Sequence, residues 1–315
     1  MQTETDVEIK RQTLREIIYE GNERFEAASL YFGHGTDNAL DEAAYLAFYA
    51  INQEFDTSDE VLDQILSSEQ IAAVNQLFNQ RIESRKPAAY LTNEAWFVGL
   101  PFYVNEDVLV PRSPIAELIE DKFQPWLQPE KVKRVLDLCT GSACIAIGCA
   151  LTFPEAIVDA ADISQSALSV AKINKQKHQL ENRLNIIESD LFSELNNQRY
   201  DLIVSNPPYV DAEDMASLPD EYRHEPELGL TAGDDGLALV IPMLRDAKNH
   251  LNPDGIIIIE VGNSETALVE MFPQVPFMWL SFEYGGEGVF LLEEKDIVKF
   301  HDDFVLKADK YSNKS

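Results

Sequence analysis

Basic residues are scarce in this chain. Its 315 residues include 25 lysines and arginines against 55 aspartates and glutamates, so the formal net charge is −30. Because phosphate backbones repel such a surface, the composition disfavours an enzyme that reads nucleic acid by its sequence. The acidity can attract a basic protein partner or serve only solubility, and the sequence leaves both interpretations open.

Disulfide frameworks, long apolar runs and metal-ligand spacings are lacking too. The three cysteines Cys139, Cys144 and Cys149 fall at steps of five, which match neither a disulfide framework nor a zinc knuckle, and the five histidines are scattered. The longest purely apolar strand, residues 256–259, is far too short to span a bilayer, and the first residues are acidic where a secretory signal is basic. We therefore expect a cytoplasmic protein with no membrane partner, no metal site and three small buried cysteines.

The pattern of apolar residues divides the chain in two. Residues 7–86 are almost free of glycine and proline and repeat apolar positions at helical spacing, which predicts a helical domain. From residue 132 onward, strands are expected at 132–138, 156–161, 184–188, 200–205, 255–261, 277–282 and 288–292, and helices at 142–151, 164–178, 236–250 and 264–271. This alternation predicts an α/β fold whose parallel sheet is covered on both faces, and the short link before the last strand should make that strand antiparallel.

A short hairpin is expected between the two parts. Strand patterns there lie at 90–91, 95–98 and 101–104. After the hairpin, Ser113 should cap a helix that runs from residue 115 to about residue 123. We therefore predict three regions, which are a helical domain at 1–88, a hairpin linker at 89–107 and an α/β domain at 108–315.

The stretch Asn206-Pro207-Pro208-Tyr209 follows directly after the apolar strand at 200–205. Proline has no amide hydrogen and a fixed φ, so the chain turns sharply there and holds its carbonyl groups at set angles. Asn206 adds a side-chain carbonyl, and Tyr209 adds a flat ring that can stack on a planar group. Two acceptors and a ring suit an uncharged planar NH2 group, as found on an amide or on an exocyclic base amine.

A second candidate site begins where the strand at 132–138 runs into a tight turn that opens a helix. This is the position where an open α/β sheet binds its ligand. The spacing resembles the glycine-rich motif D-x-G-x-G-x-G of S-adenosylmethionine-dependent methyltransferases, of which Asp137 and Gly141 remain while Cys139 and Ala143 replace the other two glycines. Both replacements are small, so the backbone can still approach a cofactor closely.

Carboxylates follow the next two strands. Asp162 is placed to bind both hydroxyls of a ribose, and Asp190 suits an exocyclic adenine amine beside apolar surface. Each of them alone could be a helix cap, but together, at successive strand ends, they favour a bound adenosine. The predicted cofactor-binding residues are Asp137, Cys139, Thr140, Gly141, Ser142, Asp162, Ile163, Asp190, Leu191 and Asn206. The chain contains no phosphate-binding G-x-x-x-x-G-K-[ST] run and no nucleophile elbow, which argues against a nucleoside triphosphatase and a serine hydrolase.

Taken together, these motifs resemble the HemK-like family of protein N(5)-glutamine methyltransferases over nearly the whole chain. The segments 224–230 and 233–237 resemble the long substrate-side loop of that family. The branch that acts on release factors typically reads P-R-P-D-T-E, whereas residues 113–117 here read S-P-I-A-E and resemble the PrmB branch, whose target is the large-subunit ribosomal protein L-three. Residues 31–38 are similar to that branch as well.

The resemblance implies a Rossmann-like methyltransferase domain, with a mostly parallel seven-stranded sheet and an antiparallel last strand, that uses S-adenosylmethionine. It implies that the helical domain recognises the protein substrate, and that Arg112 orders the lip of the crevice, although a surface ion pair is the alternative for this arginine. The residues implied to bind the target glutamine are Asn206, Pro207, Pro208 and Tyr209.

Three other functions stay open on the sequence. The chain could methylate release factors, or it could methylate adenine amines in nucleic acid, since the same four residues suit that group, although few basic residues are available. If the altered glycine motif binds no cofactor, the chain would be a non-catalytic ribosome assembly factor.

Overall fold

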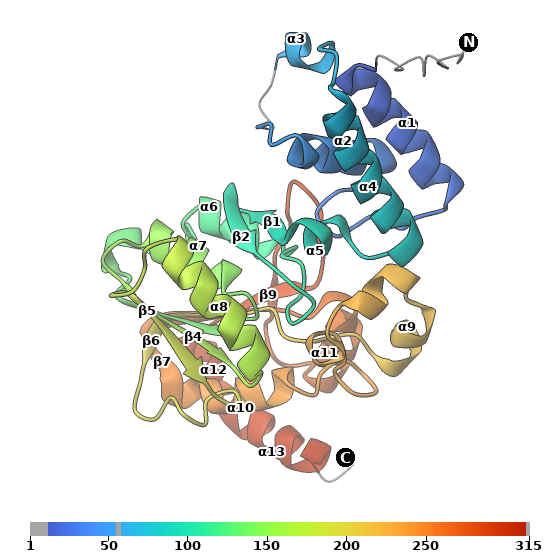
Figure 1. Cartoon of the computed structure of the whole chain (residues 1–315). Helices are drawn as coiled ribbons and strands as arrows, with labels where there is room; N and C mark the ends of the chain where they lie inside the picture. The colour runs from blue at the N-terminus through green and yellow to red at the C-terminus, as the bar shows by residue number, and fades with distance from the viewer. Residues whose placement is uncertain (1–11, 55–57, 313–315) are drawn as a thin grey trace, which may run out of the picture. The chain divides into compact units, whose positions relative to one another are not determined.

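A computed structural model describes residues 12–54 and 58–312, and these residues form two compact units (Figure 1). The first unit holds the described residues up to Asn93 together with Pro219–His224, and the second holds Glu94–Leu218 and the described residues from Glu225 onward. Among the described residues, we find no helix with the length and apolar character needed to cross a membrane.

The first unit is helical. Its core joins α1 to α4, with the rings of Phe25 and Phe78 meeting edge to face at 5.2 Å between centroids. Gly21 permits this packing, because a Cβ atom there would lie 2.5 Å from the Phe78 ring. Residues 90–91 were expected to form a strand, but they lie in α5, and the hairpin begins only at Glu94. The helices are α1 Leu14–Ala27, α2 Ala39–Ala50, α3 Asp59–Leu62, α4 Ser68–Ser84, α5 Ala88–Thr92 and the 3-10 helix η2 Asp220–His224.

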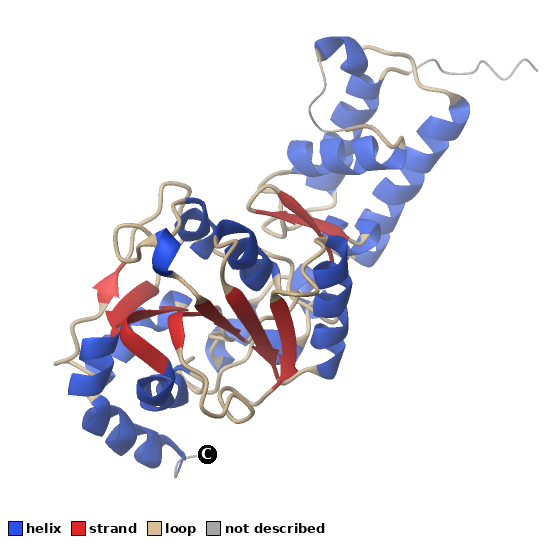
Figure 2. Cartoon of the chain, turned by 90° about the vertical axis from the view of Figure 1, so that its left-hand side faces the viewer, coloured by secondary structure: helices blue, strands red, loops and turns tan. Residues whose placement is uncertain are grey.

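The second unit begins with an antiparallel hairpin, β1 Glu94–Phe97 and β2 Leu100–Tyr103, and continues into a seven-stranded sheet (Figure 2). The sheet order is β5-β4-β3-β6-β7-β9-β8, and β9 runs antiparallel to both of its neighbours. The strands are β3 Arg134–Leu138, β4 Ile157–Asp162, β5 Leu184–Glu188, β6 Tyr200–Ser205, β7 Leu251–Glu260, β8 Met278–Trp279 and β9 Val289–Glu293. This arrangement confirms the predicted α/β class, the mostly parallel sheet and the antiparallel last strand.

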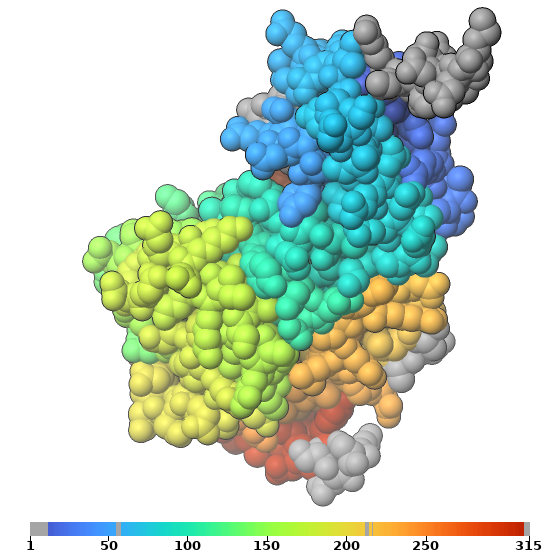
Figure 3. Space-filling model, viewed as in Figure 1, coloured from blue at the N-terminus to red at the C-terminus, as the bar shows by residue number. Residues whose placement is uncertain are grey.

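Helices cover both faces of this sheet, as the continuous run of isoleucines in β7 requires. Ile256 and Ile258 pack into the core under α6 to α8, whereas Ile257 and Ile259 pack into the core under α10 to α13. In Figures 1 and 3 the yellow-green chain of α7 and α8 closes over the sheet on the side facing the viewer. The α-helices are α6 Ile115–Glu120, α7 Cys144–Thr152, α8 Gln165–Lys177, α9 Ala212–Ser217, α10 Val240–His250, α11 Glu265–Met271, α12 Glu294–Lys299 and α13 His301–Ser312. Three further 3-10 helices are η1 Pro129–Lys131, η3 Glu227–Gly229 and η4 Gly262–Ser264.

Several element boundaries differ from the prediction. The strand expected at 277–282 is only Met278–Trp279, because β8 is an edge strand that pairs with β9 alone, and β9 starts at Val289. The helix expected to reach residue 123 ends at Glu120, and Lys122 and Phe123 adopt left-handed backbone conformations that a helix cannot continue through. The helix expected from residue 236 begins at Val240.

One buried amide on α8 joins two backbone segments near the turn after β3. Asn174 on α8 is fully buried, and its Oδ1 accepts from the Tyr103 N–H at 2.7 Å. Its Nδ2 donates to the carbonyl oxygens of Tyr103 and Ser142, both at 2.9 Å. Asn174 therefore joins the end of the hairpin to the turn after β3.

We expect Asn174→Ala to lower the free energy of unfolding by roughly 1–3 kcal/mol, because it leaves buried donors and acceptors unsatisfied. Urea unfolding followed by circular dichroism measures the change. Asn196→Ala is the matched control, since the Asn196 side chain is exposed and its bond to the Ser193 carbonyl is long at 3.3 Å. Equal midpoints for the two variants would contradict this role for Asn174.

Candidate active site

The turn after β3 is shaped from inside by a buried carboxylate. Asp137 is 1% exposed, and its Oδ2 accepts from the Thr140 hydroxyl at 2.5 Å and from the Ala146 N–H at 3.1 Å. Burial raises the pKa of Asp137 to about 7, although the bond from Thr140 opposes the rise. Asp137 and Thr140 thus join the strand end to α7, and both side chains face inward.

The three positions of the glycine motif share one backbone conformation. Cys139, Gly141 and Ala143 have φ values of 57°, 53° and 65°, all in the left-handed region. A non-glycine residue there costs about 1–2 kcal/mol, so the chain keeps the shape of the turn at some cost in stability at Cys139 and Ala143. A Cβ atom added at Gly141 would meet no other atom within 4 Å, which leaves open space above the turn.

Asp162, at the end of β4, binds this turn directly. Its Oδ2 accepts from the Gly141 N–H and its Oδ1 from the Ser164 N–H, each at 2.9 Å. Ser164 caps α8 through a bond from the Ala167 N–H, so Asp162 itself is not the helix cap. Burial raises the pKa of Asp162. Each carboxylate oxygen has a second acceptor position, so Asp162 can still take two hydroxyl groups.

Apolar and acidic side chains flank Asp162. Ile163 is 54% exposed, unusually open for an isoleucine that follows a buried strand. The Ser189 N–H donates to the Asp162 carbonyl at 2.9 Å, which brings the ends of β4 and β5 together. Asp190 directly follows Ser189, and its side chain is exposed. Leu191, the next residue, packs against the core and has a φ of 48°.

The N-P-P-Y stretch lies beside the same turn. Ser205 pairs with Leu138 across β6 and β3, and its hydroxyl donates to the Leu138 carbonyl at 2.7 Å, so Asn206 follows next to the turn. Asn206 is half-buried, and within residues 12–54 and 58–312 its side chain makes no hydrogen bond. Pro207 and Pro208 are buried. The half-buried amide of Asn206 is thus available to a ligand.

Tyr209 is fixed at both its ring and its backbone. Its hydroxyl donates to Glu260 Oε1 at 2.9 Å, and Ser264 donates to its carbonyl at 3.4 Å. Gly262 lies against the ring, since a Cβ atom there would come within 2.5 Å of it. Glu260 Oε2 accepts from the Ser113 hydroxyl at 2.6 Å, and burial raises the pKa of Glu260 to about 7.

Sequence reasoning missed Glu260, Gly262 and the role of Ser113. The signal in the sequence was Glu260, which directly follows the four isoleucines of β7. In the structure β7 pairs with β6, the strand that precedes N-P-P-Y. The predicted Ser113 cap is wrong, because the N-cap residue is Pro114 and has no side-chain cap bond, although Ser113 does accept from the Ile115 N–H at 3.2 Å.

Arg112 forms a bidentate pair with Glu225. Its Nη1 and Nη2 donate to the two carboxylate oxygens, each at 2.5 Å, and the Val110 N–H donates to the same carboxylate at 3.1 Å. Glu225 is 5% exposed. Arg112 is thus in an ion pair, as the alternative expected, but its partner is a buried carboxylate that bonds it twice, and a role at the lip of the crevice stays a prediction.

The pKa of Glu260 predicts a pH dependence of stability. In the folded state the Glu260 carboxyl keeps its proton up to about pH 7, whereas its ordinary pKa is near 4.5. Its contribution to the free energy of unfolding is therefore complete below pH 4.5 and is lost as pH rises through 7. We expect Glu260→Gln to reduce the fall in unfolding free energy between pH 4.5 and 7, measured by denaturant titration at several pH values. The slope that remains belongs in part to Asp137, which titrates in the same range. An unchanged slope would refute the assignment.

Comparisons of the sequence with known proteins identify a family for this chain. A family model described as the methyltransferase small domain matches residues 122–218. A ribosomal protein uL3 glutamine methyltransferase from Francisella tularensis is 45% identical over 304 residues, 96% of this chain and 97% of the relative. One of the same name from Xanthomonas campestris is 48% identical over 286 residues, 91% and 92% of the two chains. A solved methyltransferase from Pyrococcus furiosus is 19% identical, aligns over 62% of this chain and 89% of its own, and gives a TM-score of 0.45. The chain belongs to the family of ribosomal protein uL3 glutamine methyltransferases.

Proposed function

We propose that this protein transfers a methyl group from S-adenosylmethionine to the side-chain amide nitrogen of a glutamine in ribosomal protein uL3. Both relatives are named for that substrate and cover more than nine-tenths of the chain, which favours uL3 over release factors. The observation that carries the proposal is the half-buried Asn206 amide, which makes no hydrogen bond within the described part of the chain and lies beside the turn after β3.

The residues around this turn suit the cofactor. The open space over Gly141 permits close approach, and Asp162 keeps two acceptor positions for ribose hydroxyls. Ile163 and Leu191 offer apolar surface to the adenine ring, and Asp190 can accept from its amine. The backbone of Cys139, Thr140, Gly141 and Ser142 would line the rest of the site. When bound, the cofactor supplies a methyl group on a positively charged sulfur, open to attack by a nucleophile.

The glutamine nitrogen must be oriented before it can react. An amide nitrogen is a poor nucleophile because its lone pair is delocalised into the carbonyl group. We assign the Asn206 side-chain oxygen and the Pro207 carbonyl as acceptors for its two N–H groups, which fixes its direction and stabilises the positive charge that grows on nitrogen. Tyr209, fixed by Glu260 and Gly262, would stack on the amide plane, and the buried Pro208 keeps the turn rigid. No strong base is required, since the proton can leave after the methyl transfer.

The helical unit is proposed to recognise uL3. A ribosomal protein rich in lysine and arginine should be drawn to a chain of net charge −30, and electrostatic attraction of this kind mainly raises the rate of encounter. We expect the reaction to take place in the cytoplasm, where ribosomal proteins are made.

We expect Asn206→Ala to abolish methyl transfer and to leave the fold intact, because the lost acceptor stands at a strand end outside the core. Transfer of labelled methyl groups to purified uL3, with mass spectrometry to locate the modified glutamine, measures the activity. Asn196→Ala should remain active. Substantial turnover by Asn206→Ala would refute the assignment of the acceptor, and methylation of duplex DNA in place of uL3 by the unaltered protein would refute the proposed function.

Asp162→Ala should weaken the binding of S-adenosylmethionine by about 1–3 kcal/mol, the usual penalty for hydroxyl groups that lose a buried partner. Calorimetric titration measures the affinity. Glu188→Ala is a suitable control, since Glu188 is an exposed carboxylate at the end of the neighbouring strand β5. Equal affinities for both variants would place the ribose elsewhere, and no binding heat for the unaltered protein would favour a non-catalytic assembly factor.

A further inference from the structure

The loop that follows N-P-P-Y belongs to both units of the structure. After Tyr209 the chain continues in the second unit to Leu218, and the six residues Pro219–His224 then belong to the helical unit. The chain returns to the second unit at Glu225, whose carboxylate binds Arg112. We define Pro219–His224 as the tether segment. Nothing in its composition sets it apart, so its placement must come from specific contacts.

Glu221 provides the main contact of the tether segment. Its side chain is fully buried, and its Oε1 accepts from the Tyr31 N–H at 3.0 Å. The same oxygen pairs with Arg85 Nη2 at 2.9 Å and lies 3.6 Å from Arg81 Nη1. A carboxylate without water around it is stable only when cations and N–H groups surround it, and the helical unit supplies all three partners.

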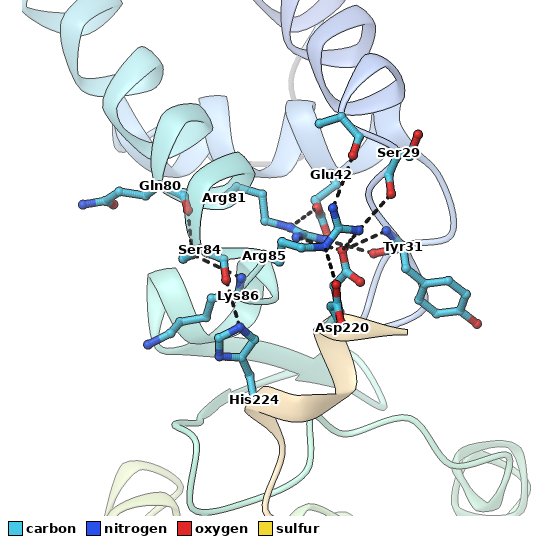
Figure 4. A network of polar contacts seen from close by, with 12 residues as sticks. Ser29, Tyr31, Glu42, Gln80, Arg81, Ser84, Arg85, Lys86, Asp220 and His224 are labelled. Atoms are coloured by element: carbon cyan, nitrogen blue, oxygen red, sulfur yellow. Dashed lines mark hydrogen bonds and ion pairs between the residues drawn. The ribbon is translucent and has the colours of Figure 1, made fainter. Parts of the chain in front are cut away.

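The two arginines are fixed by the helical unit itself. Arg81 is 0% exposed, and it donates to Glu42 Oε1 at 2.7 Å and to the Tyr31 carbonyl at 2.9 Å. Arg85 donates to the Ser29 carbonyl at 2.8 Å. Figure 4 shows both side chains, from the end of α4, directed toward Glu42, Tyr31 and Ser29. Glu42 pairs with Arg81, and Glu221 offers a buried carboxylate to both arginines, whereas Asp220, 3.9 Å from Arg85, is exposed.

Two further side chains of the tether segment contact the helical unit. The Tyr222 ring lies 4.5 Å from the His34 ring and 5.7 Å from the Tyr31 ring, between centroids. The His224 ring nitrogen Nε2 is 2.9 Å from the Ser84 carbonyl oxygen. By contrast, the side chains of Asp220 and Arg223 are 56% and 78% exposed. Glu221, Tyr222 and His224 are thus directed into the helical unit, whereas Asp220 and Arg223 are exposed.

We propose that Glu221 is a positioning residue for the methyl transfer, because its pairing with Arg81 and Arg85 lets the helical unit fix the loop between Tyr209 and Glu225. A free loop of this length must lose conformational entropy when a protein substrate binds against it. A loop whose central residues are bound to the helical unit has lost much of that entropy before the substrate binds. The helical unit therefore acts on the reaction through the tether segment, in addition to contacting the substrate. This inference rests on the proposed function for its kinetic test.

The kinetic test compares Glu221→Ala with Asp220→Ala in the full-length protein. Glu221→Ala should raise the KM for purified uL3 about tenfold, within the range observed for residues that couple distant parts of a protein. The dissociation constant for S-adenosylmethionine should stay unchanged, and kcat at saturating uL3 should change less than KM. Asp220→Ala removes the adjacent, exposed carboxylate, whose pair with Arg85 spans 3.9 Å, and should behave like the unaltered protein. Equal KM values for the two variants would overturn the proposal.

Limited proteolysis tests the tether without any methyl acceptor. Trypsin cleaves after Arg223, and cleavage requires several residues around the bond to leave the helical unit. We expect Glu221→Ala to be cut there at least tenfold faster than Asp220→Ala, with mass spectrometry identifying the site. If the unaltered protein fails to methylate uL3 but this difference appears, the tether stands and the proposed function fails. If both variants are cut at the same rate, the tether is wrong whatever the substrate.

Two more variants separate local release from general unfolding. Glu221→Gln keeps an oxygen for the Tyr31 N–H and removes only the charge, so its KM should lie between those of the unaltered protein and Glu221→Ala. Adding Arg85→Ala to Glu221→Ala should raise KM by less than the product of the two single fold-changes, so that the free-energy effects are not additive, because the two changes remove one shared contact. Additive effects would show that Glu221 and Arg85 act separately and would overturn the pairing on which the proposal depends.

Discussion

The pairing of β3 with β6 is the constraint on which the site depends. Leu138 and Ser205 are register partners, and the Ser205 hydroxyl reinforces the pairing by donating to the Leu138 carbonyl. Because both strands are parallel and end together, the turn that follows one and the N-P-P-Y stretch that follows the other begin at neighbouring points. A donor and an acceptor of a methyl group need such adjacency, since the two must approach within a few ångströms and in line.

Buried carboxylates organise the rest of the second unit's site. Asp137 accepts from the Thr140 hydroxyl within the turn, Asp162 accepts from the Gly141 N–H, and Glu260 orients the ring of Tyr209. In each case the charged form loses hydration, which raises the pKa, and hydrogen bonds from the protein compensate in part. Through these bonds, each of the three groups holds a loop at the ends of the strands.

The sequence predicted the features that depend on neighbouring residues. Strands 184–188 and 200–205 have the expected bounds, because each is an apolar run closed by polar or turn-forming residues, and the turn at Gly141 follows from its strand and helix. Contacts between distant residues were missed. Ser113 and Glu260 are 147 positions apart, and Arg112 and Glu225 are 113 apart. The tether segment has no pattern of its own that would assign it to the helical unit.

The thiol of Cys139 lies in the turn that is proposed to receive an alkylating cofactor, where it would be a rival acceptor for the methyl group. Burial, aided by the negative charges of Asp162 and Asp137, raises the pKa of this thiol far above its ordinary range. A protonated thiol is a weak nucleophile. The carboxylates that bind the turn therefore also disfavour alkylation of the protein's own thiol. This is why Cys139 can occupy a glycine position of the motif without inactivating the enzyme.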